Sequence, residues 1–230
     1  MSSHASLQEP SALTREEEQA EGIRRLEEDI IFGRFAPGSR LIEDTLMTRY
    51  GASRHFVRQG LFQLERQGIV LREKNIGATV RFYSAEEVRQ IYEVREMLTR
   101  QAALMIELPA PADLVEQLTE LQRQYCAKAD AQDLRGIHEA NDAFHVAMFA
   151  ACGNPYLVRS LQDYMNLTLP MRAKNLADRE GLALSRRQHE FMIDLLKGRD
   201  SWAFAQLCVD HMQYSKSDYL GRIGGDDSEN

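Results

Sequence analysis

Apolar side chains recur at helical spacing along most of this chain, and residues 41–67 combine two such stripes with a glycine between them. The pattern predicts a helix over residues 42–50, a turn at Gly51, and a second helix that buries Val57, Leu61 and Leu64. Ser53 stands at the N-cap of the second helix, where its hydroxyl is expected to accept a backbone hydrogen bond. Two short helices joined in this way predict a helix-turn-helix.

A strand–turn–strand pattern follows at once. Residues 69–72 and 78–81 form two short runs separated by a turn that ends at Gly77. A hairpin directly after a recognition helix predicts a wing, whose tip can enter the minor groove, and Gly77 would allow close backbone approach there.

From Ser84 onward the apolar positions keep only the helical period, and Ser84 with Glu87 forms a predicted capping box. Helices are expected over about 85–107, 112–129, 134–151, 156–175 (kinked at Pro170), 179–197, and from 201. Six helices with short joints predict an antiparallel bundle. The predicted fold is mainly α: a disordered leader (1–19), a winged helix-turn-helix (20–83) that begins with a helix over about 20–32, the bundle (84–222) and a tail (223–230).

The polar face of the second short helix carries the first functional signal. Arg54, His55, Arg58 and Gln59 cluster in its first two turns, where the backbone N–H groups and the helix dipole already favour phosphate. Arginine side chains at this position can fork onto guanine edges in the major groove. The alternative is an ordinary helical hairpin with a charged solvent face. Arg40, after the Pro–Gly step, is a further candidate for contact with the DNA backbone.

Charge changes this picture when it is counted by segment. The whole chain has a net charge of -7, but residues 21–83 carry 11 Lys and Arg against 8 Asp and Glu. A mildly basic N-terminal module on an acidic partner domain suits a protein that touches DNA at one end. The 3 cysteines lack paired spacing, and no signal peptide or apolar run of ~20 residues is present. We therefore expect a cytoplasmic protein with no membrane contact.

The runs FGRFAPGSRL, LMTRYGASRHFVRQGLFQLERQGIV and NIGATV resemble the winged-helix domain of GntR-family bacterial transcription regulators. Their Pro-Gly-x-x-Leu, Ser-Arg-x-x-Val-Arg and Leu-x-x-Leu-x-x-x-Gly steps all occur here at the family's spacing. Met47, Phe56, Gly60 and Ile76 stand where the family usually has Ala, Pro, Ala and Arg. The resemblance implies a homodimer that binds a pseudo-palindromic operator, with a recognition helix in each of two successive major grooves.

Three histidines of the second domain, His145, His189 and His211, lie on three different predicted helices, and Asn141 precedes His145 by one turn. Side chains on facing helices can converge on a metal in a bundle core, and neutral imidazoles suit zinc, nickel and similar ions. From spacing alone, the ordinary interpretation is that histidines on separate helices are structural or exposed, and His138 shows how easily further residues join such a pattern.

A resemblance to a known domain favours the interpretation that these residues bind a metal. The runs NDAFH, GNP, QHE and DHM are similar to the FCD effector-binding domain of FadR-like GntR regulators, and the predicted helix count is that of its VanR-like branch. This likeness implies that Asn141, His145, His189 and His211 bind a divalent cation at the floor of a pocket. It also implies that Arg95 lines that pocket. Tyr92, Arg95 and Thr99 share one helix face, and we expect Arg95 to hold a carboxylate of a small organic acid. The alternative is a surface salt bridge between Arg95 and a neighbouring glutamate.

The leading hypothesis is a transcription regulator, most simply a repressor, controlled by such an acid. A metal-dependent hydrolase is a second hypothesis, but Glu190, which adjoins His189, points to a different helix face and leaves no evident general base. A helical dimerisation protein in which the histidines only pack is the third.

Overall fold

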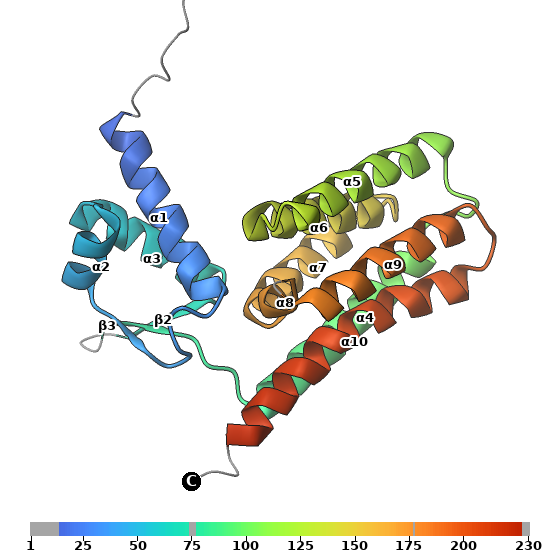
Figure 1. The fold of residues 1–230 in the computed structure, drawn as a ribbon. Helices are drawn as coiled ribbons and strands as arrows, with labels where there is room; N and C mark the ends of the chain where they lie inside the picture. Colours follow the sequence, from blue (N-terminus) through green and yellow to red (C-terminus); the bar gives the residue numbers. More distant parts are fainter. Residues whose placement is uncertain (1–13, 74–76, 177, 227–230) are drawn as a thin grey trace, which may run out of the picture.

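The computed structural model describes residues 14–73, 77–176 and 178–226, and these form two domains that lie side by side (Figure 1). The N-terminal domain contains six elements: α1 (Arg15–Ile31), β1 (Arg40–Leu41), α2 (Glu43–Tyr50), α3 (Arg54–Arg66), β2 (Val70–Glu73) and β3 (Gly77–Val80). The C-terminal domain contains α4 (Ala85–Leu104), α5 (Ala112–Asp130), α6 (Leu134–Ala150), α7 (Pro155–Leu167), α8 (Leu169–Leu176), α9 (Arg179–Leu196) and α10 (Ser201–Asp226). The predicted class, a winged helix-turn-helix followed by a helical bundle, is confirmed.

The three strands form one antiparallel sheet in the order β1-β3-β2. The short strand β1 was not predicted, because two residues carry no periodic signal; it pairs Arg40 with Thr79 of β3. Gly51 ends α2 with a φ of 62°, as expected. Ser53 occupies the N-cap of α3, but its side chain makes no capping hydrogen bond, which corrects that part of the prediction.

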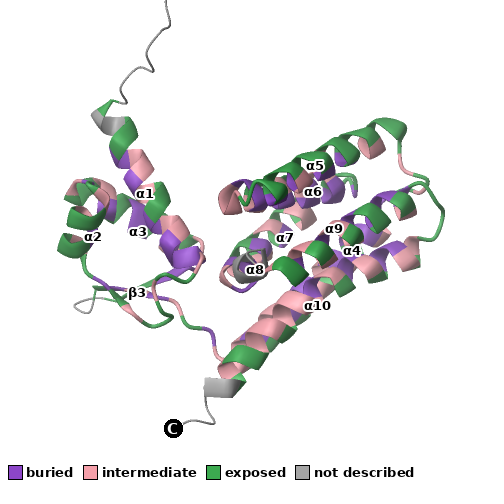
Figure 2. Cartoon of the chain, viewed as in Figure 1, coloured by how far each residue is buried: buried purple, intermediate pink, exposed green. Residues whose placement is uncertain are grey.

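A single apolar core holds the winged helix together. The predicted stripe of Val57, Leu61 and Leu64 is buried there against Leu26 of α1. One member of this core comes from the other domain: Leu169, the first residue of α8, is only 5% exposed. The buried faces of the bundle turn inward in the same way (Figure 2).

Two boundaries differ from the prediction. The expected fourth helix of the bundle is two helices, α7 and α8, separated at Thr168, so the described part of the bundle has seven helices rather than six. Pro170 has no N–H and fits the first turn of a new helix, which turns the expected kink into a break. The helix α1 begins at Arg15, because Thr14 and Glu17 form a capping box; the rest of the predicted leader, 1–13, lies outside the described residues.

The bundle also extends into the predicted tail. The helix α10 runs to Asp226, through two glycines that were expected to end it. Glycine weakens a helix by about 1 kcal/mol without forbidding it, so it is a poor stop signal on its own. Among the described residues no helix is both long and apolar enough to cross a bilayer.

Substitution of two turn glycines should separate backbone strain from a contact between the domains. Gly51 and Gly68 both have positive φ, but a Cβ on Gly51 would meet nothing within 4 Å, whereas one on Gly68 would lie 2.8 Å from Leu167 Cδ2 and 3.1 Å from the Tyr83 hydroxyl. We expect Gly51→Ala to lower the free energy of unfolding by about 1 kcal/mol and Gly68→Ala by about 2–3 kcal/mol. Urea denaturation of both variants measures this, and equal losses would contradict the contact with Leu167.

Candidate functional site

The recognition-helix surface, defined here as Arg54, His55, Arg58 and Gln59, is exposed at the start of α3. Because Val57 and Leu61 on the opposite face are buried against α1, α3 can turn only this polar face to solvent. Arg40, on β1, is also exposed, and its guanidinium nitrogens lie 3.9 Å from the Cβ position of Gly77 at the start of β3. Arg40 therefore stands beside the wing; residues 74–76 at its tip lie outside the described residues.

Both arginines of this surface are ion-paired with the first turn of α2. Arg58 Nε lies 2.9 Å from both carboxylate oxygens of Glu43, and Arg54 pairs with Asp44. The arginine side chains keep 53% and 58% of their surface exposed, so each pair contributes no more than about 1 kcal/mol. A phosphate or a guanine edge can therefore replace the carboxylates at small cost.

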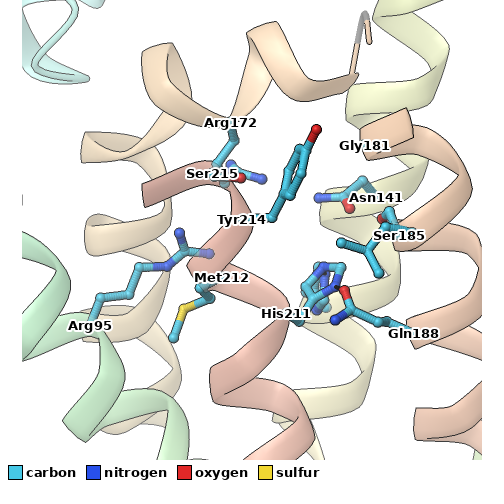
Figure 3. A pocket seen from close by; sticks show the side chains of 12 residues that line it. Arg95, Asn141, Arg172, Gly181, Ser185, Gln188, His211, Met212, Tyr214 and Ser215 are labelled. Carbon is cyan, nitrogen blue, oxygen red and sulfur yellow. Dashed lines mark hydrogen bonds between the residues drawn. The ribbon is translucent and has the colours of Figure 1, made fainter. Parts of the chain in front are cut away.

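A second site lies inside the bundle, where α4, α6, α8, α9 and α10 leave a cavity of about 40 Å³ (Figure 3). Arg95 and Arg172 stand on one side of it, and Asn141 and Gln188 on the other. The volume is enough for about two or three water molecules. An adjoining cavity of about 10 Å³ is lined by Thr99 together with Arg95, His145 and His211. The lining residues include Arg95, Asn141, His145, Arg172, Gln188 and His211.

The three histidines predicted from the sequence meet beside this cavity, which His145 and His211 line and His189 does not. One ring nitrogen from each of His145, His189 and His211 lies within 4.8 Å of the others. The Nε2 atoms of His145 and His211 are 3.2 Å apart. His189 is fully buried, and its ring stacks on Phe144 with a centroid distance of 4.3 Å. Asn141 is buried at the same cavity, and its amide nitrogen donates to Asp142, which leaves the amide oxygen as the atom with the chemistry of a metal ligand.

Hydrogen bonds to two glutamines decide which nitrogen carries the proton in two of the three rings, those of His189 and His211. The amide nitrogen of Gln122 donates to the carbonyl oxygen of Arg186 at 3.1 Å, so its oxygen faces His189 Nδ1, at 2.9 Å. Because an oxygen can only accept, Nδ1 of His189 is the donor and Nε2 bears a lone pair. That Nε2 is buried and has no hydrogen-bond partner. Gln188 Oε1 lies 2.8 Å from His211 Nδ1 and orients that ring in the same way.

The electrostatics of the cavity keep the imidazoles neutral. Burial holds the pKa of His145 and of His189 well below its ordinary value. Burial, with the positive charges of Arg95 and Arg172, lowers the pKa of His211 to about 3. A neutral ring with its proton on Nδ1 offers Nε2 as a donor to a cation.

The two arginines of the cavity differ in how their charge is compensated. Arg172 pairs with Asp142 at 2.8 Å. Arg95 is 5% exposed and bonds to the neutral Thr168 hydroxyl at 2.9 Å, and in the described part of the chain it makes no ion pair. Burial lowers the pKa of Arg95 to about 10, which still leaves it charged at neutral pH. A buried, uncompensated guanidinium of this kind is costly unless an anion joins it.

These residues fit a divalent cation. Three neutral imidazoles suit zinc or nickel, and two nitrogens on one zinc ion at 2.0–2.1 Å would stand about 3.3 Å apart in tetrahedral geometry. The observed 3.2 Å between His145 and His211 agrees with that spacing. The orphaned Nε2 of His189 is the strongest sign, because it is a buried acceptor that lacks a donor among the described residues.

Sequence reasoning placed most of the cavity residues but not all. Tyr92 is fully buried beside Val88 and Met171 and lines neither cavity, but the Arg95 guanidinium lies 5.7 Å from its ring centroid. Its part in effector binding stays a prediction. Arg172 and Gln122 were missed, because nothing in the sequence indicates that α8 and α5 approach the histidines. The available signal for Arg172 was its place two residues after Pro170, inside a helix predicted to be kinked there.

Comparisons with known proteins identify the class of this chain. The model of the bacterial regulatory proteins of the gntR family matches residues 19–80, and that of the FCD domain matches residues 90–214. The HTH-type transcriptional repressor GlaR of Escherichia coli strain K12 is 25% identical over 203 residues, which cover 84% of this chain and 91% of that protein. YdhC of Bacillus subtilis strain 168, an HTH-type transcriptional regulator, is 25% identical over 194 residues, 83% and 85% of the two chains.

Solved structures agree on the fold. McbR/YncC of Escherichia coli has a TM-score of 0.65 at 21% identity and covers 90% of this chain and 98% of its own. A GntR regulator from Rhodococcus sp. RHA1 has a TM-score of 0.63 at 20% identity, with coverage of 90% and 97%. The protein is thus a DNA-binding transcription regulator and not an enzyme. It belongs to the GntR family and carries an FCD domain in its C-terminal half.

Loss of the Arg58 side chain should weaken DNA binding without unfolding the protein. We expect Arg58→Ala to cost about 1–3 kcal/mol of binding free energy, because the exposed guanidinium is free to exchange Glu43 for a base edge or phosphate. Fluorescence anisotropy at matched salt, with a duplex selected by the wild-type protein from a random library, measures this. The matched control is Arg123→Ala, an exposed arginine paired with Glu120 on α5. Equal affinities of wild type and Arg58→Ala would remove α3 as the recognition helix.

The buried histidines should make the metal-free protein sensitive to acid. Their folded pKa lies below the unfolded value of about 6.5, so below that pH the unfolded chain binds protons that the folded one does not. Stability is therefore fully present above pH ~6.5 and falls as the pH falls, by up to about 1.4 kcal/mol per pH unit for each histidine. Urea denaturation in EDTA at pH 7.5 and 5.5 tests this. The variant His211→Gln should show a smaller loss, and an unchanged loss would contradict the assignment.

Proposed function

We propose that this protein is a repressor whose affinity for its operator is controlled by a small carboxylate metabolite bound in the bundle cavity, beside a divalent cation on the histidines. The observation that carries the proposal is the buried guanidinium of Arg95, which has a hydroxyl as its partner and no ion pair among the described residues. A carboxylate that enters the cavity would accept charge-assisted hydrogen bonds from it.

Asn141, His145, His189 and His211 would hold the cation. When bound, the ion would supply a Lewis-acidic position for one carboxylate oxygen. The chain's own contribution is to orient two of the rings: Gln122 and Gln188 accept from the Nδ1 atoms of His189 and His211, which leaves the Nε2 lone pairs of these rings for the cation. All four candidate ligand groups are uncharged, so a bound cation and Arg95 would together attract an anion. The size of the cavity, about 40 Å³, favours a compact acid.

The regulatory side of the proposal has separate support. Repression is suggested by the relative GlaR, whose name describes a transcriptional repressor. Binding as a homodimer to a pseudo-palindromic operator would place two recognition-helix surfaces one helical turn of DNA apart. The site of action would be the cytoplasm, where bacterial DNA is found.

Thermal unfolding tests the cavity directly. After treatment with EDTA and dialysis, we expect Zn²⁺ alone to raise the Tm of the wild-type protein, and a compact carboxylate, from a panel of dicarboxylates that begins with oxalate, to raise it further. A ligand at a hundredfold excess over its Kd adds about 2.7 kcal/mol, or roughly 5 °C or more for a chain of this size.

Two variants separate the parts of the site. His189→Gln should abolish the Zn²⁺ shift, and Arg95→Met should retain it but lose the carboxylate shift. The neutral diamide of each responding acid is the matched ligand control. A panel without any carboxylate response, or a response that Arg95→Met leaves intact, would overturn the proposed effector. A responding acid is then expected to change the Kd for the selected duplex.

A further inference from the structure

One short segment touches both the cavity and the winged helix. The break between α7 and α8 brings Leu167, Thr168, Leu169 and Arg172 within six consecutive residues, and each contacts a different part of the protein. Figure 1 shows α8 at the end of the bundle nearest to α1 and β2. We call residues 167–172 the junction segment.

On the cavity side, the junction segment contains Arg172 and forms a hydrogen bond with Arg95. The Thr168 hydroxyl, fully buried, accepts a hydrogen bond from Arg95 Nη1 at 2.9 Å. Arg172 belongs to α8 itself, donates to Asp142 of α6 at 2.8 Å, and also donates to the carbonyl oxygen of Met165 at 3.2 Å. Among the described residues that line the cavity, these two arginines are its guanidiniums. Both guanidiniums also carry a buried Nε without a hydrogen-bond partner, so an anion bound there would act on side chains that Thr168 and Asp142 hold in place.

On the other side, the junction segment is part of the core of the winged helix. Leu169 is 5% exposed and packs in the same cluster as Leu26, Ile30 and Leu64. Leu167 approaches Gly68, at the end of the recognition-helix element, closely enough that a Cβ there would lie 2.8 Å from its side chain. A packed core transmits small shifts because it cannot deform continuously.

We propose that the junction segment couples the state of the cavity to the placement of the winged helix, with the Arg95–Thr168 hydrogen bond and the burial of Leu169 as its two ends. The coupling to an effector rests on the function proposed above, but the coupling itself does not. A change at Arg95 releases or tightens Thr168, α8 shifts as a short rigid helix, and Leu169 carries the shift into the core beneath α3. Operator affinity then responds to a residue that does not touch DNA.

A double-mutant cycle without any effector tests this, so that its failure is distinguishable from failure of the effector proposal. The Kd for the selected duplex is measured for wild type, Arg95→Met, Leu169→Ala and the double variant. We expect Arg95→Met to change the Kd by about 2- to 30-fold. In the Leu169→Ala background that change should fall below about 1.5-fold, because the link to the winged helix has been removed.

Two controls separate coupling from loss of stability and from another route. Leu118→Ala removes an equally buried leucine from α5, in the core of the bundle, and should leave the effect of Arg95→Met intact. Arg135→Ala breaks a different contact between the domains, the 3.3 Å ion pair with Glu28 of α1, and should also leave the effect of Arg95→Met intact. The proposal is overturned if Arg95→Met leaves the Kd unchanged, if its effect persists with Leu169→Ala, or if Arg135→Ala abolishes it.

Hydrogen exchange keeps the test decisive if Leu169→Ala does not fold. Arg95→Met in the full chain should change amide protection in α8 and in α1, which shares a core with Leu169. The milder Leu169→Val should reduce the change in α1 and preserve the change in α8. Protection changes confined to the bundle would contradict the proposed coupling.

Discussion

Three imidazoles and two guanidiniums lie inside the helical bundle, and the cost of removing them from water governs the arrangement around them. A buried polar group without a partner costs a few kcal/mol, so nearly every one of these groups is matched. Gln122 and Gln188 take the Nδ1 protons, Asp142 compensates Arg172, and Thr168 accepts from Arg95. Among the described residues, the Nε2 of His189 and the Nε atoms of Arg95 and Arg172 are buried without a hydrogen-bond partner. These atoms mark where a cation and an anion would bind.

The two domains use charge in opposite ways. On the recognition-helix surface, Arg54 and Arg58 sit in exposed ion pairs that water screens, and such pairs exchange partners at little cost. In the cavity, the Arg172–Asp142 ion pair and the Arg95–Thr168 hydrogen bond are shielded from water. A change of partner there costs more free energy than it does at the surface. A regulator needs both behaviours: a surface that binds and releases DNA, and an interior that registers a small molecule.

The connection between them is a consequence of chain geometry. Pro170 divides what would be one long helix, and the new helix α8 starts with Leu169 in the winged-helix core and continues one turn later with Arg172 at the cavity. A continuous helix through this region would keep a straight course within the bundle. The relatives and the solved structures fix the class and the fold of the chain, while this local arrangement is read from its own residues.

Local signals were sufficient for much of the molecule. Capping residues, glycines at turns and the helical period were enough to predict α2, α3 and α4. The resemblance to the FCD domain was enough to group His145, His189 and His211, which the structure brings together. Some boundaries were wrong. The prediction started α1 too late because it did not use the capping box of Thr14, and it ended α10 too early because glycines near residue 224 do not stop a helix on their own. The partners of the cavity could not be deduced in this way. Gln122, Arg172 and Leu169 lie on helices whose mutual placement depends on packing between residues far apart in the sequence, and periodicity says which face of a helix is buried but not which other helix covers it.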